Sequence, residues 1–282
     1  MKTVELDHIS RHFGALKAND NISFTFEAGK IYAILGENGA GKSTMMKILS
    51  GFQEPTSGKL HIDTYPVHFE NPNDAIEHGI GMLYQDPLDY APLTALENFM
   101  MGRPGGMTLR RQEARAAFEK QCQRLKFDLK PFVAVRDMTI AERQQLEIVR
   151  LLSLGVQFLI LDEPTTGIST ERKLLLFDTL RSLAHDDDMI IALVSHKLED
   201  VSALCDEVMV LRRGQLVGTG TLPILDSNLV EMMFGQYIEQ QSTTGYAADA
   251  VRLRVQDVEV RTARFTVPGI DIDVHTGEVV GL

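Results

Sequence analysis

Short, unbroken apolar runs alternate along this chain with segments in which apolar residues recur at helical spacing. The unbroken runs occupy residues 31–35, 158–161 and 189–194. Continuous apolar runs are typical of parallel strands, because such strands are covered on both faces. After the first run, residues 45–49 show the period of a helix that ends at Gly51. The pattern predicts an α/β fold built around a buried sheet.

A glycine-rich loop joins the first apolar run to the helix that follows it. Residues 36–43 have the spacing G-x-x-x-x-G-K-[ST], which lets backbone N–H groups surround phosphate oxygens. In this motif Lys42 can reach the β and γ oxygens, the Ser43 hydroxyl can hold Mg²⁺, and the helix start favours negative charge. The chain is therefore expected to bind a nucleoside triphosphate through Gly36, Glu37, Asn38, Gly39, Ala40, Gly41, Lys42, Ser43 and Thr44.

The second apolar run ends in the acidic pair Asp162 and Glu163, followed by Pro164. In an open α/β sheet a carboxylate at this end of a strand lies near the phosphate loop, so Asp162 is a candidate ligand for Mg²⁺. Glu163 is then the candidate base that orients or polarises the water attacking the γ-phosphate. The alternative is an ordinary acidic turn before proline. The phosphate loop upstream favours the catalytic interpretation.

The third apolar run is followed directly by Ser195 and His196. A histidine after a strand is usually structural or lies on the surface. This one follows a buried strand that comes after the carboxylate strand, which is the order expected of a residue that senses the γ-phosphate. We therefore interpret His196 as catalytic, with a structural role as the alternative.

Composition and charge narrow the class of protein without naming a function. The chain has 282 residues, is 44% hydrophobic and carries a net charge of −11, which favours a globular protein over one whose surface binds nucleic acid. The N-terminus lacks a signal-peptide pattern, and no apolar run approaches the roughly 18–20 residues that cross a bilayer. Cys122 and Cys205 have no metal-ligand spacing and fit a reducing compartment. We therefore expect a cytoplasmic location.

The ordered set of motifs resembles the nucleotide-binding domain of ABC transporters over residues 1 to about 237. The resemblance implies a P-loop NTPase of α/β class, with an ABC-type mixed core sheet, a β subdomain and an inserted helical subdomain at about 88–155. It also implies ATP and Mg²⁺ as cofactors. The motifs that carry it are residues 36–43, Tyr84-Gln85, Leu161-Asp162-Glu163-Pro164-Thr165 and Ser195-His196.

Two further residues take roles from this resemblance. Phe13 matches the aromatic residue that stacks on adenine in the family, and an ordinary core phenylalanine is the alternative. Phe24 and Phe26 alternate on a strand and are better core candidates, which leaves Phe13 for stacking. Gln85 matches the family's glutamine, which touches Mg²⁺ or the attacking water and reports the nucleotide state to the membrane subunit.

The family signature, usually Leu-Ser-Gly-Gly-Gln, is altered at residues 138–142. Thr139 as N-cap with Glu142 three residues later predicts a capping box at a helix start, which is also a purely structural explanation. In the family this helix start and its hydroxyl face the γ-phosphate of the opposite domain, a role that Thr139 retains by resemblance. The missing glycines weaken this half-site, because a branched Ile140 hinders close backbone approach.

The form of this signature resembles that of tandem-domain importers of monosaccharides and nucleosides. Ser169 stands where the family usually has an inter-domain aspartate, and such importers often lack that aspartate in their first domain. The resemblance therefore argues against two equal catalytic sites. The site built on this domain's own phosphate loop is expected to be chemically complete if its partner supplies a competent signature.

The stretch between Gln85 and the signature has the periodicity of a helical subdomain that Pro131 closes. In transporters this subdomain and the Gln85 loop cradle a short cytoplasmic helix of the membrane subunit, so a groove here would be a partner site. Residues 101–107, with three glycines, are predicted to form a surface loop. The positions at helical spacing, explained by core packing, are Leu96, Phe99, Met100, Met101, Ala114, Phe118, Cys122 and Leu125.

The C-terminal residues repeat an earlier pattern. Residues 270–279 correspond without gaps to residues 22–31, with the same alternation followed by glycine and a strand. We therefore predict an ABC nucleotide-binding domain at 1–237, a polar linker at 238–250 and the truncated start of a second nucleotide-binding domain at 251–282.

The leading hypothesis is an Mg²⁺-dependent ATPase subunit that powers import of a small solute, a monosaccharide in first place. The alternatives are a nucleoside importer, a soluble tandem ABC protein acting on ribosomes, a non-hydrolysing regulatory domain and a P-loop kinase. Residues 221–250 contain no Lys or Arg, which counts against the ribosome-associated proteins. Glu163 counts against a non-hydrolysing module, and the acidic pair together with His196 counts against a kinase.

The hypothesis also specifies partners and a location. The expected partners are transmembrane permease subunits, the second ABC domain of the same chain and, indirectly, a periplasmic or extracellular solute-binding protein. No nucleic acid is expected as a partner, given the acidic net charge. The expected location is peripheral, at the cytoplasmic face of the inner membrane.

Overall fold

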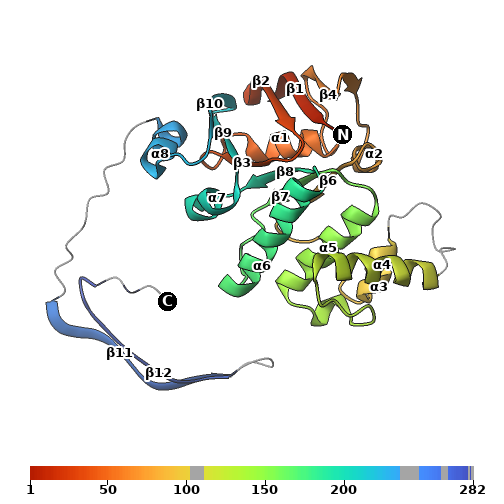
Figure 1. Cartoon of the computed structure of the whole chain (residues 1–282). Helices are drawn as coiled ribbons and strands as arrows, with labels where there is room; N and C mark the ends of the chain where they lie inside the picture. The colour runs from red at the N-terminus through yellow and green to blue at the C-terminus, as the bar shows by residue number, and fades with distance from the viewer. Residues whose placement is uncertain (102–110, 236–247, 262–265, 279, 281–282) are drawn as a thin grey trace. The chain divides into compact units, whose positions relative to one another are not determined.

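The computed structural model describes residues 1–101, 111–235, 248–261, 266–278 and 280 (Figure 1). The chain divides into two compact units, Met1–Tyr237 and Ile238–Leu282. Most of the loop predicted at 101–107 and most of the linker predicted at 238–250 lie outside the described residues.

The first unit is built around a six-stranded sheet of strand order β10-β9-β3-β8-β7-β6. Neighbouring strands from β9 to β6 are parallel, whereas β10 pairs with β9 in the antiparallel sense, so the sheet is mixed. The three apolar runs form the adjacent strands β3, β8 and β7, which confirms the prediction of buried parallel strands. The strands are β3 (Ile31–Leu35), β6 (Ile80–Leu83), β7 (Phe158–Asp162), β8 (Ile190–Val194), β9 (Glu207–Arg212) and β10 (Gln215–Thr221).

Both faces of this sheet are covered, because the side chains of β3 divide between two hydrophobic clusters. Ile31, Ala33 and Leu35 belong to one cluster, which contains the helical segment that precedes β7. Tyr32 and Ile34 belong to the other, which contains the first two strands and the helix after the phosphate loop. This division follows from the alternation of side chains along a strand.

A second sheet of order β2-β1-β4-β5 covers one face of the core sheet together with α1, and Figure 1 shows it above the core. All its pairs are antiparallel. The two predicted core phenylalanines lie here: Phe26 is fully buried, and Phe24 packs on it with ring centroids 4.8 Å apart. The elements are β1 (Thr3–Phe13), β2 (Leu16–Glu27), α1 (Lys42–Leu49), β4 (Ser57–Ile62) and β5 (Tyr65–Val67).

The predicted helical segment lies on the opposite face, below the core sheet in Figure 1. Most of its predicted core positions are buried, Met100 is half-buried against them, and the rings of Phe99 and Phe118 are 5.4 Å apart. Met101 is an exception, because it lies one residue beyond α3 and is 36% exposed, so its assignment to the helix core was wrong. The elements are α3 (Ala95–Met100), α4 (Arg111–Leu125), the 3-10 turn η2 (Val135–Asp137) and α5 (Ile140–Ser153).

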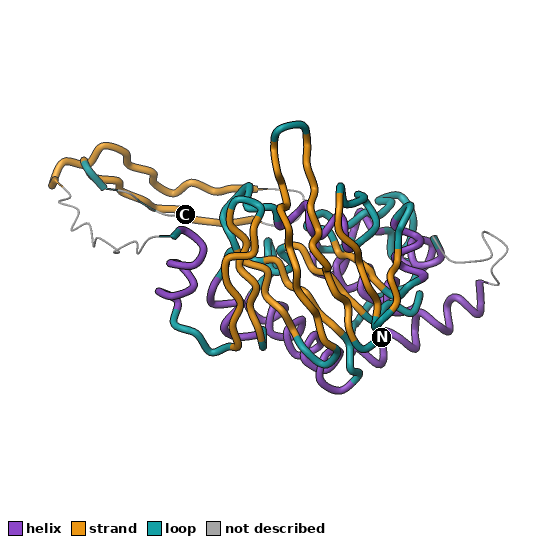
Figure 2. The backbone as a smooth tube through the Cα atoms, turned by 90° about the horizontal axis from the view of Figure 1, so that it is seen from above, coloured by secondary structure: helices purple, strands orange, loops and turns teal. Residues whose placement is uncertain are grey.

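The remaining helices of the first unit flank its strands, and Figure 2 distinguishes the two element types by colour. Within the described residues, no helix combines the length and apolar content needed to cross a bilayer. These elements are α2 (Pro72–Glu77), α6 (Thr170–Arg181), the π-helical turn η3 (Ser182–Asp186), α7 (Leu198–Leu204) and α8 (Asp226–Phe234).

The second unit contains an antiparallel hairpin of β11 (Ala248–Arg261) and β12 (Thr266–Thr276). Its register repeats the register of β1 and β2, the hairpin that opens the first unit. The corresponding cross-strand pairs are Val4–Phe26 and Leu253–Val274, Leu6–Phe24 and Val255–Ile272, and Ile9–Ile22 and Val258–Ile270.

The repeat extends to a β-bulge at the same place in both hairpins. His8 in β1 and Asp257 in β11 have φ values of 54° and 47°, unusual for residues with a side chain. Each uses its backbone N–H to bind a side-chain oxygen of the facing strand, Ser23 Oγ at 3.0 Å and Asp271 Oδ1 at 2.8 Å. The internal repeat found in the sequence is therefore also a repeat of local backbone geometry.

Candidate nucleotide-binding site

The glycine-rich loop connects the end of β3 to the start of α1, as the sequence predicted. Gly36 and Gly41 have φ values of 145° and 105°, and Gly41 is the N-cap of α1. A Cβ on Gly36 would lie 2.2 Å from the carbonyl oxygen of Leu211, and one on Gly41 would lie 2.3 Å from that of Ala18. Glycine is therefore required at both positions by the strands that pack against the loop.

The tip of the loop has the form of a phosphate cradle. Glu37, Asn38 and Gly39 are exposed, and no atom lies within 4 Å of a Cβ built on Gly39. Ala40 is buried and holds the loop against the core. The first turn of α1 follows directly, with Ser43 exposed, so open backbone and a helix start adjoin in an arrangement that can hold a polyphosphate.

Lys42 folds back over this loop. Its Nζ donates hydrogen bonds to the carbonyl oxygens of Gly36 at 2.6 Å and Glu37 at 2.9 Å. Burial lowers the pKa of Lys42, and the charges of Glu163 and Asp162 oppose that shift. The ammonium group thus contacts the loop and lies close enough to the acidic pair for their charges to act on it.

Asp162 is the last residue of β7, and Glu163 follows it at the carboxyl edge of the sheet. Burial and the neighbouring charge of Glu163 raise the pKa of Asp162, while Lys42 lowers it. Hard cations such as Mg²⁺ prefer carboxylate and hydroxyl oxygens, so Asp162 together with Ser43 suits this metal. The donor set present therefore fits the metal that the sequence predicted.

Glu163 is held in a strained backbone conformation. Its φ is 47°, and its backbone N–H donates to the carbonyl oxygen of Val194 at 2.9 Å. Its Oε1 lies 2.8 Å from Nδ1 of His196, and its Oε2 accepts a longer hydrogen bond of 3.4 Å from Thr166 Oγ1. A non-glycine residue with positive φ costs free energy, and such strain is typical of functional sites.

Gln85 and Phe13 are two further exposed residues predicted for this site. Gln85 is exposed and follows β6, the parallel neighbour of β7, so it lies at the carboxyl edge that also carries Asp162. Phe13 is the last residue of β1 and is 43% exposed. The Arg11 guanidinium lies 4.9 Å from the centre of its ring. Exposure of an aromatic ring leaves it available for stacking.

Thr139 is the N-cap of α5, and the predicted capping box is present. The Thr139 hydroxyl accepts a hydrogen bond from the Glu142 backbone N–H at 3.3 Å, and the Thr139 N–H donates to Glu142 Oε2 at 2.7 Å. Ile140, where the family has glycine, is 45% exposed. A Cβ built on Gly167 would lie 3.4 Å from the end of the Ile140 side chain. The altered signature therefore faces the segment that follows Glu163.

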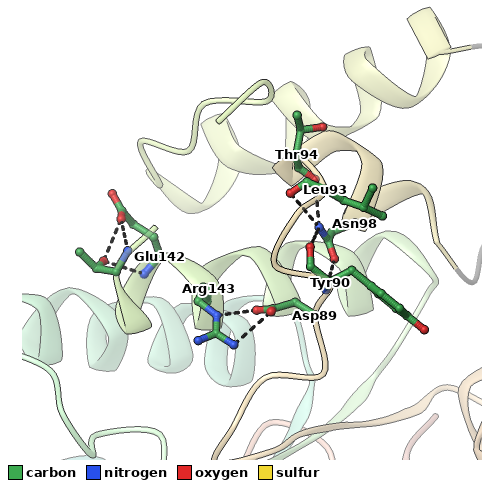
Figure 3. A network of polar contacts seen from close by, with 8 residues as sticks. Asp89, Tyr90, Leu93, Thr94, Asn98, Glu142 and Arg143 are labelled. Carbon is green, nitrogen blue, oxygen red and sulfur yellow. Dashed lines mark hydrogen bonds and ion pairs between the residues drawn. The ribbon is translucent and has the colours of Figure 1, made fainter. Parts of the chain in front are cut away.

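Several polar contacts near the site were not predicted from the sequence. The buried Asn19 donates from its side-chain amide to the Gly41 carbonyl oxygen at 3.1 Å and so holds the phosphate loop. Asp89, just beyond the Gln85 loop, binds Arg143 of α5 in a bidentate pair at 2.6 and 3.0 Å (Figure 3). Single polar residues with no local pattern carry no sequence signal, so only the fold shows these partners.

The fold and the site together define a P-loop nucleoside-triphosphate-binding domain. Residues 19–166 match the family model described as ABC transporter, and the chain belongs to this family. The mixed core sheet, the antiparallel β subdomain and the inserted helical subdomain expected of that family are all present.

Curated relatives agree with this assignment. The chain is similar to ribose and arabinose import ATP-binding proteins, among them RbsA of Rhodopirellula baltica, at 34% identity over 99% of this chain and 56% of that protein. It is also similar to the nucleoside import ATP-binding protein NupA of Lactococcus lactis, at 31% identity over the same shares. The chain thus spans about half the length of these relatives.

Among solved structures, the fold resembles the crystal structure of a nucleotide-free ATP-binding cassette from an ABC transporter. The TM-score is 0.73 at 21% identity, with 84% of this chain and 96% of that chain covered.

Proposed function

We propose that the first unit binds and hydrolyses ATP, as the subunit that powers import of a small solute, a monosaccharide in first place. The observation that carries this proposal is the gathering of Lys42, Glu163 and His196 at the carboxyl ends of adjacent strands. A lysine over a phosphate loop, a carboxylate and a histidine at one strand edge are the parts that phosphoryl transfer needs.

Each of these residues has a distinct role in the proposed reaction. Lys42 and the loop from Gly36 to Thr44 hold the β and γ phosphates. Glu163 orients the attacking water and accepts its proton as the water oxygen bonds to the γ-phosphorus, and the proton then passes to the released phosphate or to solvent. The bond from that phosphorus to the bridging oxygen breaks, which releases ADP and inorganic phosphate. His196 fixes Glu163 and contacts the γ-phosphate from the neighbouring strand.

The metal and the base of the nucleotide have their own proposed ligands. Ser43, Gln85 and Asp162 would hold Mg²⁺, which when bound neutralises charge on the phosphates. Phe13 is proposed to stack on adenine, which its exposed ring supports. Thr139 is proposed to face the ATP of the opposite domain, and the capping box and exposed Ile140 would weaken that contact.

The nature of the solute rests on the relatives. Their printed names include ribose, arabinose and nucleoside import, so a monosaccharide is the first candidate and a nucleoside the second. The names of these relatives do not favour the soluble ribosome-associated alternative. The contact between Glu163 and His196 argues against a non-hydrolysing regulatory domain, because both groups would then have no reaction to serve.

A groove beside the Gln85 loop supports the proposed membrane partner. Two adjoining pockets of about 140 and 170 Å³ share Leu88, Glu147 and Arg150 as lining residues. Leu88 and Tyr90 at this groove are 66% and 58% exposed. A short helix of a transmembrane permease would bury these apolar surfaces. The chain would then act peripherally at the cytoplasmic face of the membrane, with a solute-binding protein as an indirect partner.

We further propose that residues 251–282 are the start of a second cassette, joined to the first by a linker at 238–250. The matched register and the matched bulge of the two hairpins support this. Apolar positions that are fully buried in the first hairpin, such as Leu6 and Ile9, correspond to Val255 and Val258 in the second. The second hairpin thus has the pattern needed to open the same kind of domain.

The decisive experiment is Mg²⁺-dependent ATP hydrolysis by the full-length protein and its Glu163→Gln variant. The proposal expects hydrolysis to fall by about 10²-fold or more while ATP binding is retained, because only the acceptor for the attacking water is lost. Glu171→Gln, an exposed change on α6, is the matched control. Normal hydrolysis by Glu163→Gln would contradict the proposal, and the equivalent change in the proposed second cassette would then locate the active site.

A further inference from the structure

A buried carboxylate that the proposed reaction does not use lies behind the catalytic pair. Asp200, on α7, is 1% exposed. Its Oδ2 accepts a hydrogen bond from Thr165 Oγ1 at 2.6 Å, and its Oδ1 accepts one from Lys173 Nζ at 2.8 Å. Both oxygens therefore have a partner, and the two partners come from two further segments of the chain.

These segments are the ones that carry the catalytic residues. Thr165 lies two residues after Glu163 and is itself buried. The helix α7 begins two residues after His196 and contains Asp200. Lys173 belongs to α6, the helix that follows the Thr165 segment. Asp200 thus connects the chain after the carboxylate strand with the chain after the histidine strand.

Together with the contact between Glu163 and His196, the Thr165–Asp200 bond closes a ring. The ring runs along the chain from Glu163 to Thr165, across to Asp200, back along α7 to His196 and across to Glu163. A second link reinforces it, because Lys197 Nζ donates to the Thr165 carbonyl oxygen at 3.5 Å. A closed ring of short contacts restricts how far its members can separate.

Because Asp200 is buried and charged, the ring depends on both of its hydrogen-bond partners, Thr165 and Lys173. Burial disfavours the ionised form, but the hydrogen bonds from Lys173 and Thr165, together with the charges of Lys173 and Lys197, hold the pKa of Asp200 below its ordinary value. A buried charge that loses a partner is strongly destabilised. The segment around Thr165 is therefore held where its hydroxyl meets Asp200.

We propose that Asp200 is a positioning residue for ATP hydrolysis, whose bond to Thr165 sets the placement of Glu163 relative to His196. This inference rests on the proposed ATPase function. A displacement of a catalytic group by about 1 Å costs on the order of 100-fold in rate. Most of the proposed contacts with ATP come from the phosphate loop, which the ring does not include, and the ring meets ATP only where His196 contacts the γ-phosphate. Loss of the Thr165–Asp200 bond therefore lowers kcat and leaves the affinity for ATP unchanged.

The test compares Thr165→Val, which removes the hydroxyl at nearly constant shape, with Thr165→Ser, which keeps it. Asp200→Asn is the second disruptive change, and Glu199→Gln, an exposed change on the same helix, is its control. The full-length protein is assayed for kcat, for the KM of Mg·ATP and for the Tm without nucleotide. Thr165→Val and Asp200→Asn are expected to lower kcat by about 10- to 100-fold at unchanged KM.

Two control variants distinguish the positioning of Glu163 from a simple loss of protein stability. Thr165→Ser and Glu199→Gln are expected to keep kcat near the wild-type value, and the double variant Thr165→Val/Asp200→Asn should be no slower than the worse single variant. A Thr165→Val variant with wild-type kcat would overturn the inference, and so would a rise in KM in parallel with the fall in kcat. If Asp200→Asn does not fold, the Thr165 pair decides alone. Failure of the ATPase proposal is distinct, because Glu163→Gln would then hydrolyse ATP normally, which overturns both proposals.

Discussion

His196 Nδ1 lies 2.8 Å from Glu163 Oε1, and this contact joins the ends of two adjacent parallel strands. Glu163 reaches that position with a φ of 47°, a conformation that residues with side chains rarely adopt. The strain is maintained by the Val194 carbonyl oxygen, which binds the Glu163 N–H at 2.9 Å. The fold therefore holds a carboxylate and an imidazole together at this edge of the sheet at a cost in stability.

Removing the imidazole should separate catalysis from binding. We expect His196→Ala to lower kcat for ATP hydrolysis by about 100-fold, since Glu163 loses the group that orients it. The affinity for ATP should change little, because Lys42 and the loop remain. Steady-state hydrolysis and nucleotide titration in the full-length protein measure the two quantities. A His196→Ala variant with normal kcat would show that the contact is structural.

Removing the ring of Phe13 should weaken nucleotide binding without unfolding the protein. Stacking of a base on an aromatic side chain is worth about 1–3 kcal/mol, so Phe13→Ala should reduce ATP binding by that amount. Phe13→Tyr keeps a ring and serves as the control. The Tm without nucleotide should stay near the wild-type value, because Phe13 is 43% exposed. Equal ATP affinity in Phe13→Ala and wild type would place adenine elsewhere.

Neutralising Asp162 should stabilise the nucleotide-free protein while it abolishes hydrolysis. The pKa of Asp162 is raised by burial and by Glu163, so the folded state binds its proton more tightly than the unfolded state does. Stability is therefore lost as the pH rises through the carboxyl range, and the full cost is present at neutral pH. We expect Asp162→Asn to raise the free energy of unfolding at pH 7 by about 0.5–2 kcal/mol. Chemical denaturation checks this, and a destabilised variant would contradict it.

The capping box of α5 should contribute measurably to stability. Thr139→Ala removes the side-chain acceptor for the Glu142 N–H and should lower the free energy of unfolding by about 1 kcal/mol. Thr139→Ser keeps that acceptor and should retain most of the stability. Urea unfolding of the three proteins under one set of conditions gives the comparison. Identical midpoints for Thr139→Ala and Thr139→Ser would exclude a stabilising cap.

The stability that Asp200 provides should depend on pH in a defined direction. Its pKa is lowered in the folded protein, so its contribution is fully present above the unfolded-state value of about 3.9 and is lost as the pH falls towards the folded-state value. At pH 7 we expect Asp200→Asn to cost about 1–3 kcal/mol. This difference from wild type should shrink below about pH 4. A difference that is constant from pH 7 to pH 3 would mean that the charge of Asp200 contributes nothing.

Much of the fold followed from local pattern. The apolar runs form β3, β7 and β8. A strand that is buried on both faces has no solvent-facing positions, so its sequence is apolar throughout. The capping box at Thr139 and the start of α1 at the phosphate loop were predictable because helix ends have sequence rules that act over a few residues. Met101 was misassigned because helical spacing does not show where a short helix ends.

For the candidate site, too, local sequence motifs predicted some features, and others depend on contacts between residues far apart in the chain. The sequence by itself determined which residues have the chemistry for phosphate and metal, because the loop at 36–43 and the pair Asp162 and Glu163 lie on contiguous motifs. Only the tertiary structure decided how these motifs meet. The contact of Glu163 with His196 and the bond of Thr165 to Asp200 join residues more than thirty positions apart. Their geometry depends on strand order and helix packing, which no local pattern encodes.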